Sequence, residues 1–326
     1  MSYDKATVKL PLFFKLSLLS GFLLPTLTYI FCYAPFSTQS SQALFVPEPQ
    51  LLAQQPIQSS GVVLSAESEH STHTVRFFDE SLFFPGVQSA QQSVIPQLPL
   101  TQIKGGITPH HLLASTILSR FFSTLKTTTP STIVILGPNH NELGNYPLLT
   151  SQYDWETPFG IAQHDDSLTQ QLLTKQIAQV DETVVPTDHS VTDTIPYITY
   201  YLPQTKVVPI LISNKMNLEE IENLANQLYS VMPEDAVVVA AVDFSHYLPA
   251  NQADQKDLLT ERLMRDHEYE KIMTLNNDYL DAPATIVLFL KLMEKMNASS
   301  NVTLDHTNSG HLLNDQYTPT TSYFSI

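Results

Sequence analysis

The stretch Ser131–His140, STIVILGPNH, runs from residues that favour a buried β-strand into a Gly-Pro turn that ends in a histidine. This pattern is typical of a central strand followed by a loop at its carboxyl end. Open α/β sheets bind ligands at such loops, because the strand fixes the backbone while the loop side chains converge on a crevice. We therefore expect His140 to belong to a functional site.

Two further stretches repeat this pattern. Ile103–His111, IKGGITPHH, is a short strand-like run that ends in Pro-His-His, and Ala236–His246, AVVVAAVDFSH, is an apolar run that ends in Asp-Phe-Ser-His. If the three strands are neighbours in one parallel sheet, their carboxyl ends meet at one pocket. Imidazoles and carboxylates gathered there are a donor set that suits a divalent metal. The expected members of this pocket are His110, His140, Asp243 and His246.

Strand-like and helix-like runs alternate from about residue 100 onward. The run Leu112–Lys126 has apolar residues at helical spacing, and Pro283–Met296 begins with proline, which helices accept at their first position. The segments Val302–Thr307 and Gln316–Ser325 are expected to form antiparallel strands at one edge. This order predicts an α/β fold with a central mixed, mostly parallel sheet flanked by helices.

The chain has 326 residues, of which 43% are hydrophobic and 15% are charged, and its formal net charge is −16 at pH 7. This balance argues against nucleic acid as a partner, because phosphate contacts need clustered Lys and Arg and the 16 such residues are spread along the chain. The single cysteine, Cys32, lies in the apolar N-terminal segment. The rest of the chain therefore offers no disulfide and no thiolate ligand.

The N-terminal segment predicts a membrane anchor. Leu16–Phe36 contains 21 residues without a charge, and Lys5, Lys9 and Lys15 precede it. The positive-inside rule then places the N-terminus in the cytoplasm and the main domain outside the cell membrane, which the chain crosses once. A cleaved signal peptide and a buried soluble helix are the alternatives. We expect an anchor over residues 1–36, a flexible Ser/Gln/Pro-rich tether over 37–74 and an α/β domain over 75–326.

Familiar linear motifs do not identify the chemistry. The sequence has no His-Glu-x-x-His, no EF-hand, no Cys-x-x-Cys, no Gly-rich phosphate loop and no Gly-x-Ser-x-Gly. Ser245 lies between Phe244 and His246, but its neighbours are not those of a hydrolase nucleophile. An isolated histidine at a strand end more often has a structural role than a ligand role. Three such histidines at strand ends favour ligands.

The order of several short motifs carries a family resemblance. These are TPHH, LGPNH, W-x-TPFG, DHS followed by IPY, VVPI, DFSHY and a terminal NSG with a later tyrosine. The set resembles the Memo family, whose microbial members are called AmmeMemoRadiSam system protein B, and it covers roughly residues 103–326. That family is similar in fold to the LigB-type class III extradiol dioxygenases, which are non-haem iron enzymes. The resemblance therefore implies a Memo/LigB-like α/β fold and a mononuclear metal site.

The resemblance also assigns ligands. The family's metal-binding histidines fall on His110 of TPHH and His140 of GPNH, and its third ligand, a cysteine, falls on Asp281. Two imidazoles and a carboxylate favour Fe(II), whereas a thiolate favours softer ions, so we expect iron, with Cu or Zn as alternatives. A different role for Asp281 is N-cap of the helix that begins near Pro283.

Three more residues fall on the family's further pocket positions, where acid–base or orienting roles are expected: His189, Asp243 and His246. The sequence thus predicts a membrane-anchored, Memo-like, dioxygenase-like protein that acts as an oxidoreductase or hydrolase on an unknown small-molecule substrate. The alternative is a non-catalytic module that binds a metal or ligand and serves interaction.

Overall fold

The computed structural model describes residues 71–93, 103–298 and 300–326, which belong to one compact unit, Ser65–Ile326. No helix in these ranges combines the length and apolar character that crossing a bilayer requires. This finding contradicts our expectation of a membrane-anchored, extracytoplasmic protein, and that expectation is withdrawn. The stretch on which it rested, Leu16–Phe36, lies outside the described residues, as does the expected tether up to residue 70.

Six strands form the central sheet: β2 (Gly105–Thr108), β3 (Thr132–Pro138), β4 (Leu148–Thr150), β7 (Gln179–Val180), β8 (Lys206–Ile212) and β9 (Val237–Ala241). Their order across the sheet is β2-β9-β3-β8-β4-β7. The first four run parallel to one another, β4 is antiparallel to β8, and β7 is parallel to β4. The predicted central mixed, mostly parallel sheet is therefore confirmed.

Both faces of this sheet are covered, which explains why its strands are continuously apolar. Every residue of β3 is buried. Ile133 and Ile135 belong to one apolar cluster, while Val134 and Leu136 belong to another, because successive side chains of a strand point to opposite faces. The sheet is thus the middle layer of three.

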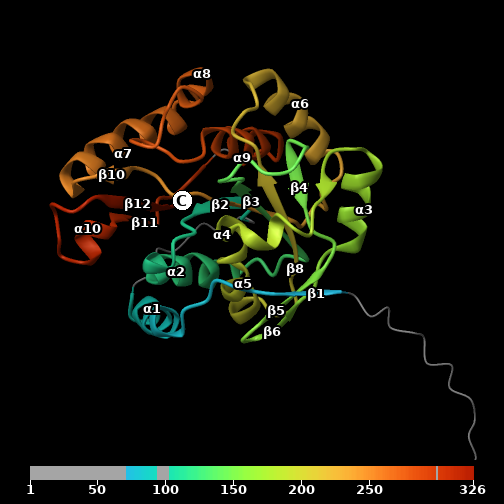
Figure 1. Ribbon diagram of the computed structural model, residues 1–326, viewed down its shortest axis with the longest axis horizontal. Helices are drawn as coiled ribbons and strands as arrows, with labels where there is room; N and C mark the ends of the chain where they lie inside the picture. Colours follow the sequence, from blue (N-terminus) through green and yellow to red (C-terminus); the bar gives the residue numbers. More distant parts are fainter. Residues whose placement is uncertain (1–70, 94–102, 299) are drawn as a thin grey trace, which may run out of the picture. The chain divides into compact units, whose positions relative to one another are not determined.

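Helices on each face supply the outer layers. One face packs against α6 (Leu218–Tyr229) and α9 (Pro283–Lys295), and the other against α1 (Glu80–Gln92), α2 (Ser115–Leu125) and α5 (Ile195–Tyr201). Figure 1 shows these two groups on opposite sides of the strands. A capping box formed by Asn217 and Glu220 defines the start of α6, and Pro283 is the first residue of α9, as the sequence predicts.

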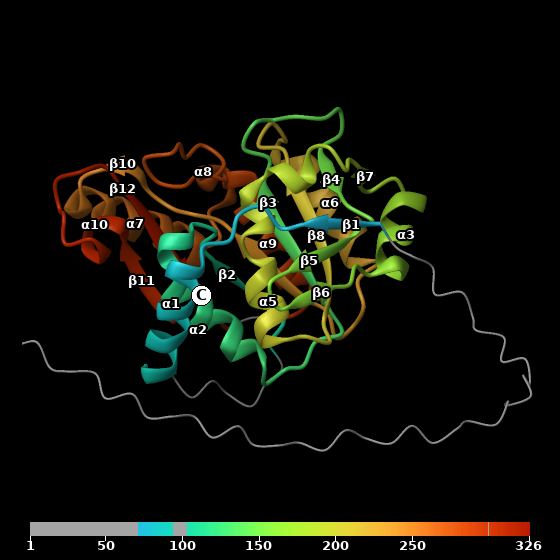
Figure 2. The same ribbon diagram turned by 60° about the horizontal axis from the view of Figure 1, so that its bottom comes forward.

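A second sheet joins the N-terminal described residues to the domain. It contains β1 (Thr72–Thr74), β5 (Asp154–Thr157) and β6 (Gly160–Ala162), with β1 parallel to β5. Figure 2 shows β1 running alongside β5 and β6. Regular structure therefore begins before residue 75, where we expected the domain to start.

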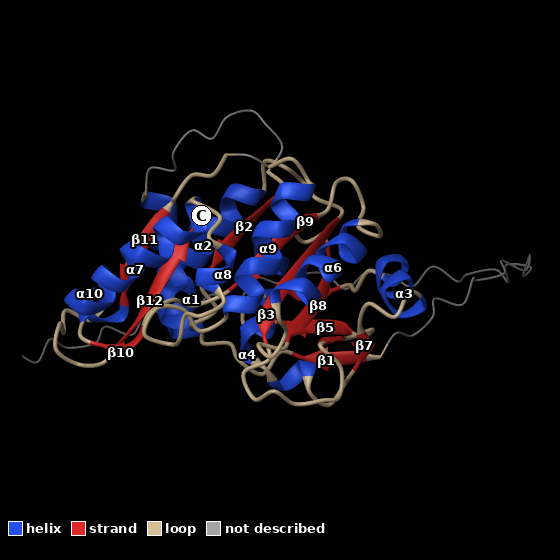
Figure 3. Ribbon diagram, turned by 90° about the horizontal axis from the view of Figure 1, so that it is seen from above, coloured by secondary structure: helices blue, strands red, loops and turns tan. Residues whose placement is uncertain are grey.

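A third sheet lies at the β2 edge of the central sheet. Strands β10 (His246–Leu248), β12 (Thr320–Ser325) and β11 (Asp305–Asn308) pair antiparallel in that order. The backbones of Ile326 and Ile107 exchange two hydrogen bonds, with N···O distances of 2.9 and 3.1 Å, which holds this sheet beside β2 (Figure 3). The predicted antiparallel pair at one edge is confirmed.

The remaining described helices are short, apart from α3 and α7. They are η1 (Leu112–Ala114), α3 (Asp166–Thr174), η2 (Val185–Thr187), α4 (His189–Thr192), α7 (Ala250–Arg265), α8 (Tyr269–Ile272) and α10 (Ser309–Leu312). Among them, α4 matters most for function, because it packs against the carboxyl end of β3. A Cβ on Gly137 would lie 2.5 Å from Ser190 Oγ, so only glycine allows this close approach.

Candidate metal centre

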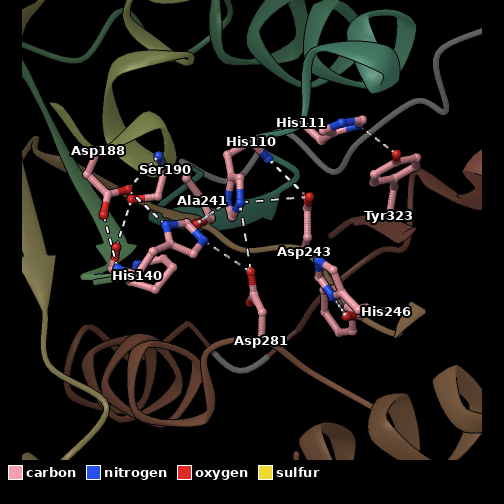
Figure 4. Close-up of polar contacts among 12 residues, drawn as sticks. His110, His111, His140, Asp188, Ser190, Ala241, Asp243, His246, Asp281 and Tyr323 are labelled. Atoms are coloured by element: carbon pink, nitrogen blue, oxygen red, sulfur yellow. Dashed lines mark hydrogen bonds and ion pairs between the residues drawn. The ribbon is translucent and has the colours of Figure 1, made fainter. Parts of the chain in front are cut away.

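Three adjacent parallel strands of the central sheet place side chains at their carboxyl ends. β9 lies between β2 and β3, and the loops after these strands carry Asp243, His110 and His140 respectively. Their carboxyl ends therefore meet, as the repeated strand-turn-histidine pattern predicts. Figure 4 shows His110, His140, Asp243 and Asp281 converging on one region.

Three histidines form the centre of this region. His110, His140 and His189 each offer a ring nitrogen within 4.8 Å of those of the other two, a group that could hold a metal ion. The rings of His140 and His189 stack with centroids 4.4 Å apart, and the His110 ring stands edge-on to both. His189 is the first residue of α4, so the packing of that helix on β3 brings it to the group.

Hydrogen bonds at Nδ1 aim the Nε2 atoms of two histidines. His110 Nδ1 donates to the backbone oxygen of Ala241 at 3.1 Å, and a carbonyl can only accept. His140 Nδ1 lies 2.9 Å from Asp188 Oδ1, and the His140 backbone N–H donates to Asp188 Oδ2 at 3.0 Å. Holding Nδ1 in this way fixes the ring and leaves Nε2 for a metal, as in known metal sites.

Asp281 completes the arrangement. Its Oδ2 lies 3.8 Å from His110 Nε2 and 3.8 Å from His140 Nε2, and its side chain is only 7% exposed. Neither carboxylate oxygen has a hydrogen-bond partner among the described residues. A separation of 3.8 Å is too long for a hydrogen bond. Two coordinate bonds of about 2.0–2.2 Å each can span it, so these atoms fit a metal ion.

Asp281 does not cap helix α9. Helix α9 has Ala282 at its N-cap and no side-chain cap hydrogen bond. Asp281 is instead fixed through its backbone, whose oxygen accepts a hydrogen bond from Asn214 Nδ2 at 2.9 Å. The carboxylate is therefore free to face the histidines.

The electrostatics show that a cation is favoured between these groups. Burial lowers the pKa of His140, but the Asp188 and Asp281 carboxylates outweigh burial and raise it to about 10. Burial raises the pKa of Asp188, but its hydrogen bonds with His140 and Ser190 outweigh burial and lower it to about 2. Without a metal, His140 is thus a cation at pH 7. A divalent ion would replace that proton.

Asp243 supports His110, whereas His246 lies apart. Asp243 Oδ1 accepts the His110 backbone N–H at 3.1 Å, and Oδ2 lies 3.8 Å from His110 Nε2. His246 is in β10, where its Nδ1 bonds the Phe244 backbone oxygen at 2.6 Å, and it is not a member of the three-histidine group. Its predicted acid–base role stays a prediction.

Two residues near the centre were not predicted from sequence. Asp188 orients His140 and also caps α4 through the Ser190 backbone N–H, and the only sequence signal was its place in the Asp-His-Ser motif. Asp193 lies one helical turn after His189 and is buried. Burial, together with the negative charges of Asp243 and Asp188, raises the pKa of Asp193 to about 8.

Comparisons with known proteins identify the family of this chain. Residues 87–325 match the family model described as Memo-like protein. The chain is 29% identical over 203 residues to a MEMO1 family protein of Aquifex aeolicus, covering 60% of this chain and 75% of that protein. It is also 29% identical over 240 residues to a MEMO1 family protein of Sulfurisphaera tokodaii, covering 68% of this chain and 83% of that protein.

Among solved structures, an uncharacterized protein of Escherichia coli K12 is similar at a TM-score of 0.47 and 12% identity, covering 68% of this chain and 98% of that one. This similarity is too low to support an argument. The family match carries the assignment, because it extends over far more than half of the chain. The predicted resemblance is confirmed, and the protein belongs to the Memo-like family.

Proposed function

We propose that the protein is a metal-dependent enzyme in which His110, His140 and Asp281 hold one divalent ion. The observation that carries this proposal is the buried Asp281 carboxylate, which has no hydrogen-bond partner among the described residues and lies 3.8 Å from two Nε2 atoms. In the metal-free protein this carboxylate has only ion-pair contacts at 3.8 Å with the two imidazoles, and a divalent ion between them would bond to its oxygen directly. The two histidines lie on loops that follow strands of the central sheet, and Asp281 lies just before α9, where its backbone N–H donates to the Asp243 backbone oxygen at 3.4 Å.

The donor set favours Fe(II), with Cu or Zn as alternatives. Two imidazoles and one carboxylate are typical of non-haem Fe(II) sites that leave coordination positions open for other molecules. A bound Fe(II) supplies Lewis acidity and redox chemistry for the transformation of a small organic substrate. The absence of a cysteine at position 281 makes a soft-metal site the less favoured choice.

The protein's own residues would orient the ligands and move protons. Asp188 fixes the His140 ring, and Asp243 fixes the backbone of His110. Burial and the neighbouring His110 and His140 lower the pKa of His189 to about 4. A neutral His189 imidazole, stacked on His140, would accept a proton from a substrate hydroxyl.

Metal analysis of the full chain tests this proposal. The purified protein is loaded with Fe(II) under anaerobic conditions, desalted and analysed beside His140→Ala, Asp281→Ala and a control, His267→Ala, whose side chain is 51% exposed. We expect about one iron per chain in the wild type and the control, and little in the two site variants. Equal iron in all four proteins would overturn the proposed ligands.

A second experiment separates an enzyme from a non-catalytic binding module. It measures oxygen consumption and product formation by the metal-loaded protein with a panel of small organic substrates. An enzyme turns over at least one substrate, and turnover disappears in Asp281→Ala. A protein that retains stoichiometric metal but converts nothing supports the non-catalytic binding module instead.

A further inference from the structure

A cavity of about 390 Å³ opens beside His189. This volume falls within the range of roughly 300–1,000 Å³ that is typical of small-molecule sites. One wall comes from the segment between β1 and α1, and another from the η1 region. Apolar side chains supply most of the lining: Phe77, Phe78, Leu82, Leu112 and Leu113.

The cavity adjoins the candidate metal centre through His189. The Phe77 ring stands edge-on to the His189 ring with centroids 6.1 Å apart, and His189 belongs to the three-histidine group. A molecule that fills the cavity therefore lies next to the metal ligands. The wall from Arg76 to Leu82 precedes residue 87, where the family match begins, so that match assigns it no role.

Arg76 and Asp193 give the cavity two polar ends. Arg76 is exposed and has no ion pair or hydrogen bond with any described residue, although acidic residues outnumber basic ones in the chain by 32 to 16. Asp193 is 4% exposed, and its Oδ1 has no hydrogen-bond partner in the described part of the chain. Both side chains line the same cavity, Arg76 on the solvent side and Asp193 on the buried side.

Each polar end requires a different group on a ligand. An unpaired guanidinium matches a carboxylate, with which it forms two parallel hydrogen bonds. A buried carboxyl oxygen without a partner matches a hydroxyl, because a hydroxyl can donate to a carboxylate or accept from a carboxylic acid. The phenylalanine and leucine walls between them match an apolar body, preferably a flat ring.

We propose that this cavity is the substrate pocket of the metal centre and that it takes a hydroxy acid whose carboxylate and hydroxyl lie at opposite ends of an apolar body. The carboxylate pairs with Arg76 at the entrance. The hydroxyl pairs with Asp193 Oδ1 beside His189. The inference rests on the proposed function only where it names the ligand as a substrate, because the pocket can be tested without any metal.

Three matched probes test the two ends separately: 3-(4-hydroxyphenyl)propionate, 3-phenylpropionate, which lacks the hydroxyl, and 3-(4-hydroxyphenyl)propan-1-ol, which lacks the carboxylate. Their dissociation constants are measured by calorimetry with the full chain, both metal-stripped and metal-loaded. We expect the first probe to bind about tenfold more tightly than either of the others, in line with one charge-assisted or buried hydrogen bond.

Two variants assign these preferences to residues. Arg76→Gln should abolish the preference for the acid over the alcohol, and Asp193→Ala should abolish the preference for the hydroxylated acid over 3-phenylpropionate. Arg265→Gln, at a side chain that is 62% exposed on α7, serves as the control and should change neither. Thermal melting of each variant shows whether it is folded.

The two proposals fail in different ways. If the chain holds no metal but the probes retain their dependence on Arg76 and Asp193, the metal centre is wrong and the pocket stands. If the three probes bind equally, or if their preferences survive in both variants, the pocket assignment is overturned whatever the metal content.

Discussion

The described residues contain two clusters of side chains that could hold a metal ion, and the two clusters differ in their hydrogen bonding. His110, His140 and His189 form one group, and Asp254, Asp257 and His306 form another, each with ligand atoms within 4.8 Å of one another. We call the second group the α7 cluster, because both of its aspartates lie on that helix. By residue type and proximity alone, both groups could hold a metal.

In the α7 cluster, the carboxylate oxygens already have partners. Asp257 Oδ1 accepts from Ser245 at 2.5 Å and Oδ2 lies 2.8 Å from His306 Nε2. Asp254 is bonded to Asn308 and to His311. At the candidate metal centre, both oxygens of Asp281 lack such partners among the described residues. Residue types alone therefore do not identify a ligand site. A better sign is a buried carboxylate whose oxygens have no hydrogen-bond partners and face other potential ligands.

The largest effect that we expect concerns the α7 cluster. Asp257→Ala removes a fully buried carboxylate and leaves Ser245 and His306 without their partner, which should lower the free energy of unfolding by about 3 kcal/mol. Metal content should not change. Urea unfolding and metal analysis check this, with Asp266→Ala, at an aspartate that is 50% exposed, as the control. If Asp257→Ala stays stable but loses its metal, the α7 cluster is the metal site and the comparison is wrong.

The next effect concerns the metal centre. Asp281→Ala should weaken metal binding by about 100-fold or more. It removes a side chain that bonds to the ion itself, which costs more than removing a residue that only orients a ligand. The metal-free variant loses the ion pair between Asp281 and His140, but its free energy of unfolding should fall by less than that of Asp257→Ala, because Asp281 has no hydrogen-bond partner among the described residues. Competition with a chelator and thermal melting measure both quantities. A loss of stability without a loss of affinity would mean that Asp281 has a structural role.

A change of ligand type sharpens the same point. Asp281→Cys should retain a metal but shift the preference from Fe(II) towards Cu(I) or Zn(II), because thiolates favour softer ions. Competitive loading with equimolar metals reads out this preference. If the order of metal preference stays the same, position 281 does not contact the ion.

Metal affinity should also rise with pH. The pKa of His140 in the metal-free protein is raised to about 10, so the metal must displace a proton from this histidine at any lower pH. Affinity should therefore increase by up to about tenfold per pH unit between roughly pH 7 and 9. Chelator competition at several pH values tests this. Affinity that does not change with pH would show that His140 is not a ligand.

The last expected effect lies outside both clusters and depends on pH. The pKa of Asp193 is raised from 3.8 to about 8, so the folded state binds an extra proton between these values and stability falls as pH rises through them. Asp193→Asn cannot ionise, and its stability should exceed that of the wild type by an amount that grows from pH 4 to 8. Melting curves of the two metal-stripped proteins measure the gap. A gap that does not vary with pH would contradict a buried, proton-holding Asp193.

The sequence predicted the parts of the fold and site that depend on local patterns. The runs around Ile133 and Val237 are continuously apolar because these strands are covered on both faces, and each is followed by a polar turn. Because β2, β9 and β3 are adjacent parallel strands, the loops after β2 and β3 bring His110 and His140 to the same end of the sheet. The same logic does not place His246, because the chain has by then left β9 and entered β10.

Other features depend on packing between distant segments. The roles of Asp188 and Asp193 follow from how α4 packs on β3, and no local pattern signals them. Helix α1 contains Pro85 in its interior, and a proline at such a position argues against a helix when only the sequence is known. The lack of hydrogen-bond partners at Asp281 is likewise visible only when every neighbour is in place.

A crystal structure of the metal-loaded protein, with anomalous diffraction recorded at the absorption edge of iron, tests the central claim most directly. We expect one anomalous peak within about 2.0–2.4 Å of His110 Nε2, His140 Nε2 and Asp281 Oδ2, and none in the α7 cluster. A peak between Asp257 and His306, or an Asp281 carboxylate turned away from an ion held by the histidines alone, would contradict the account.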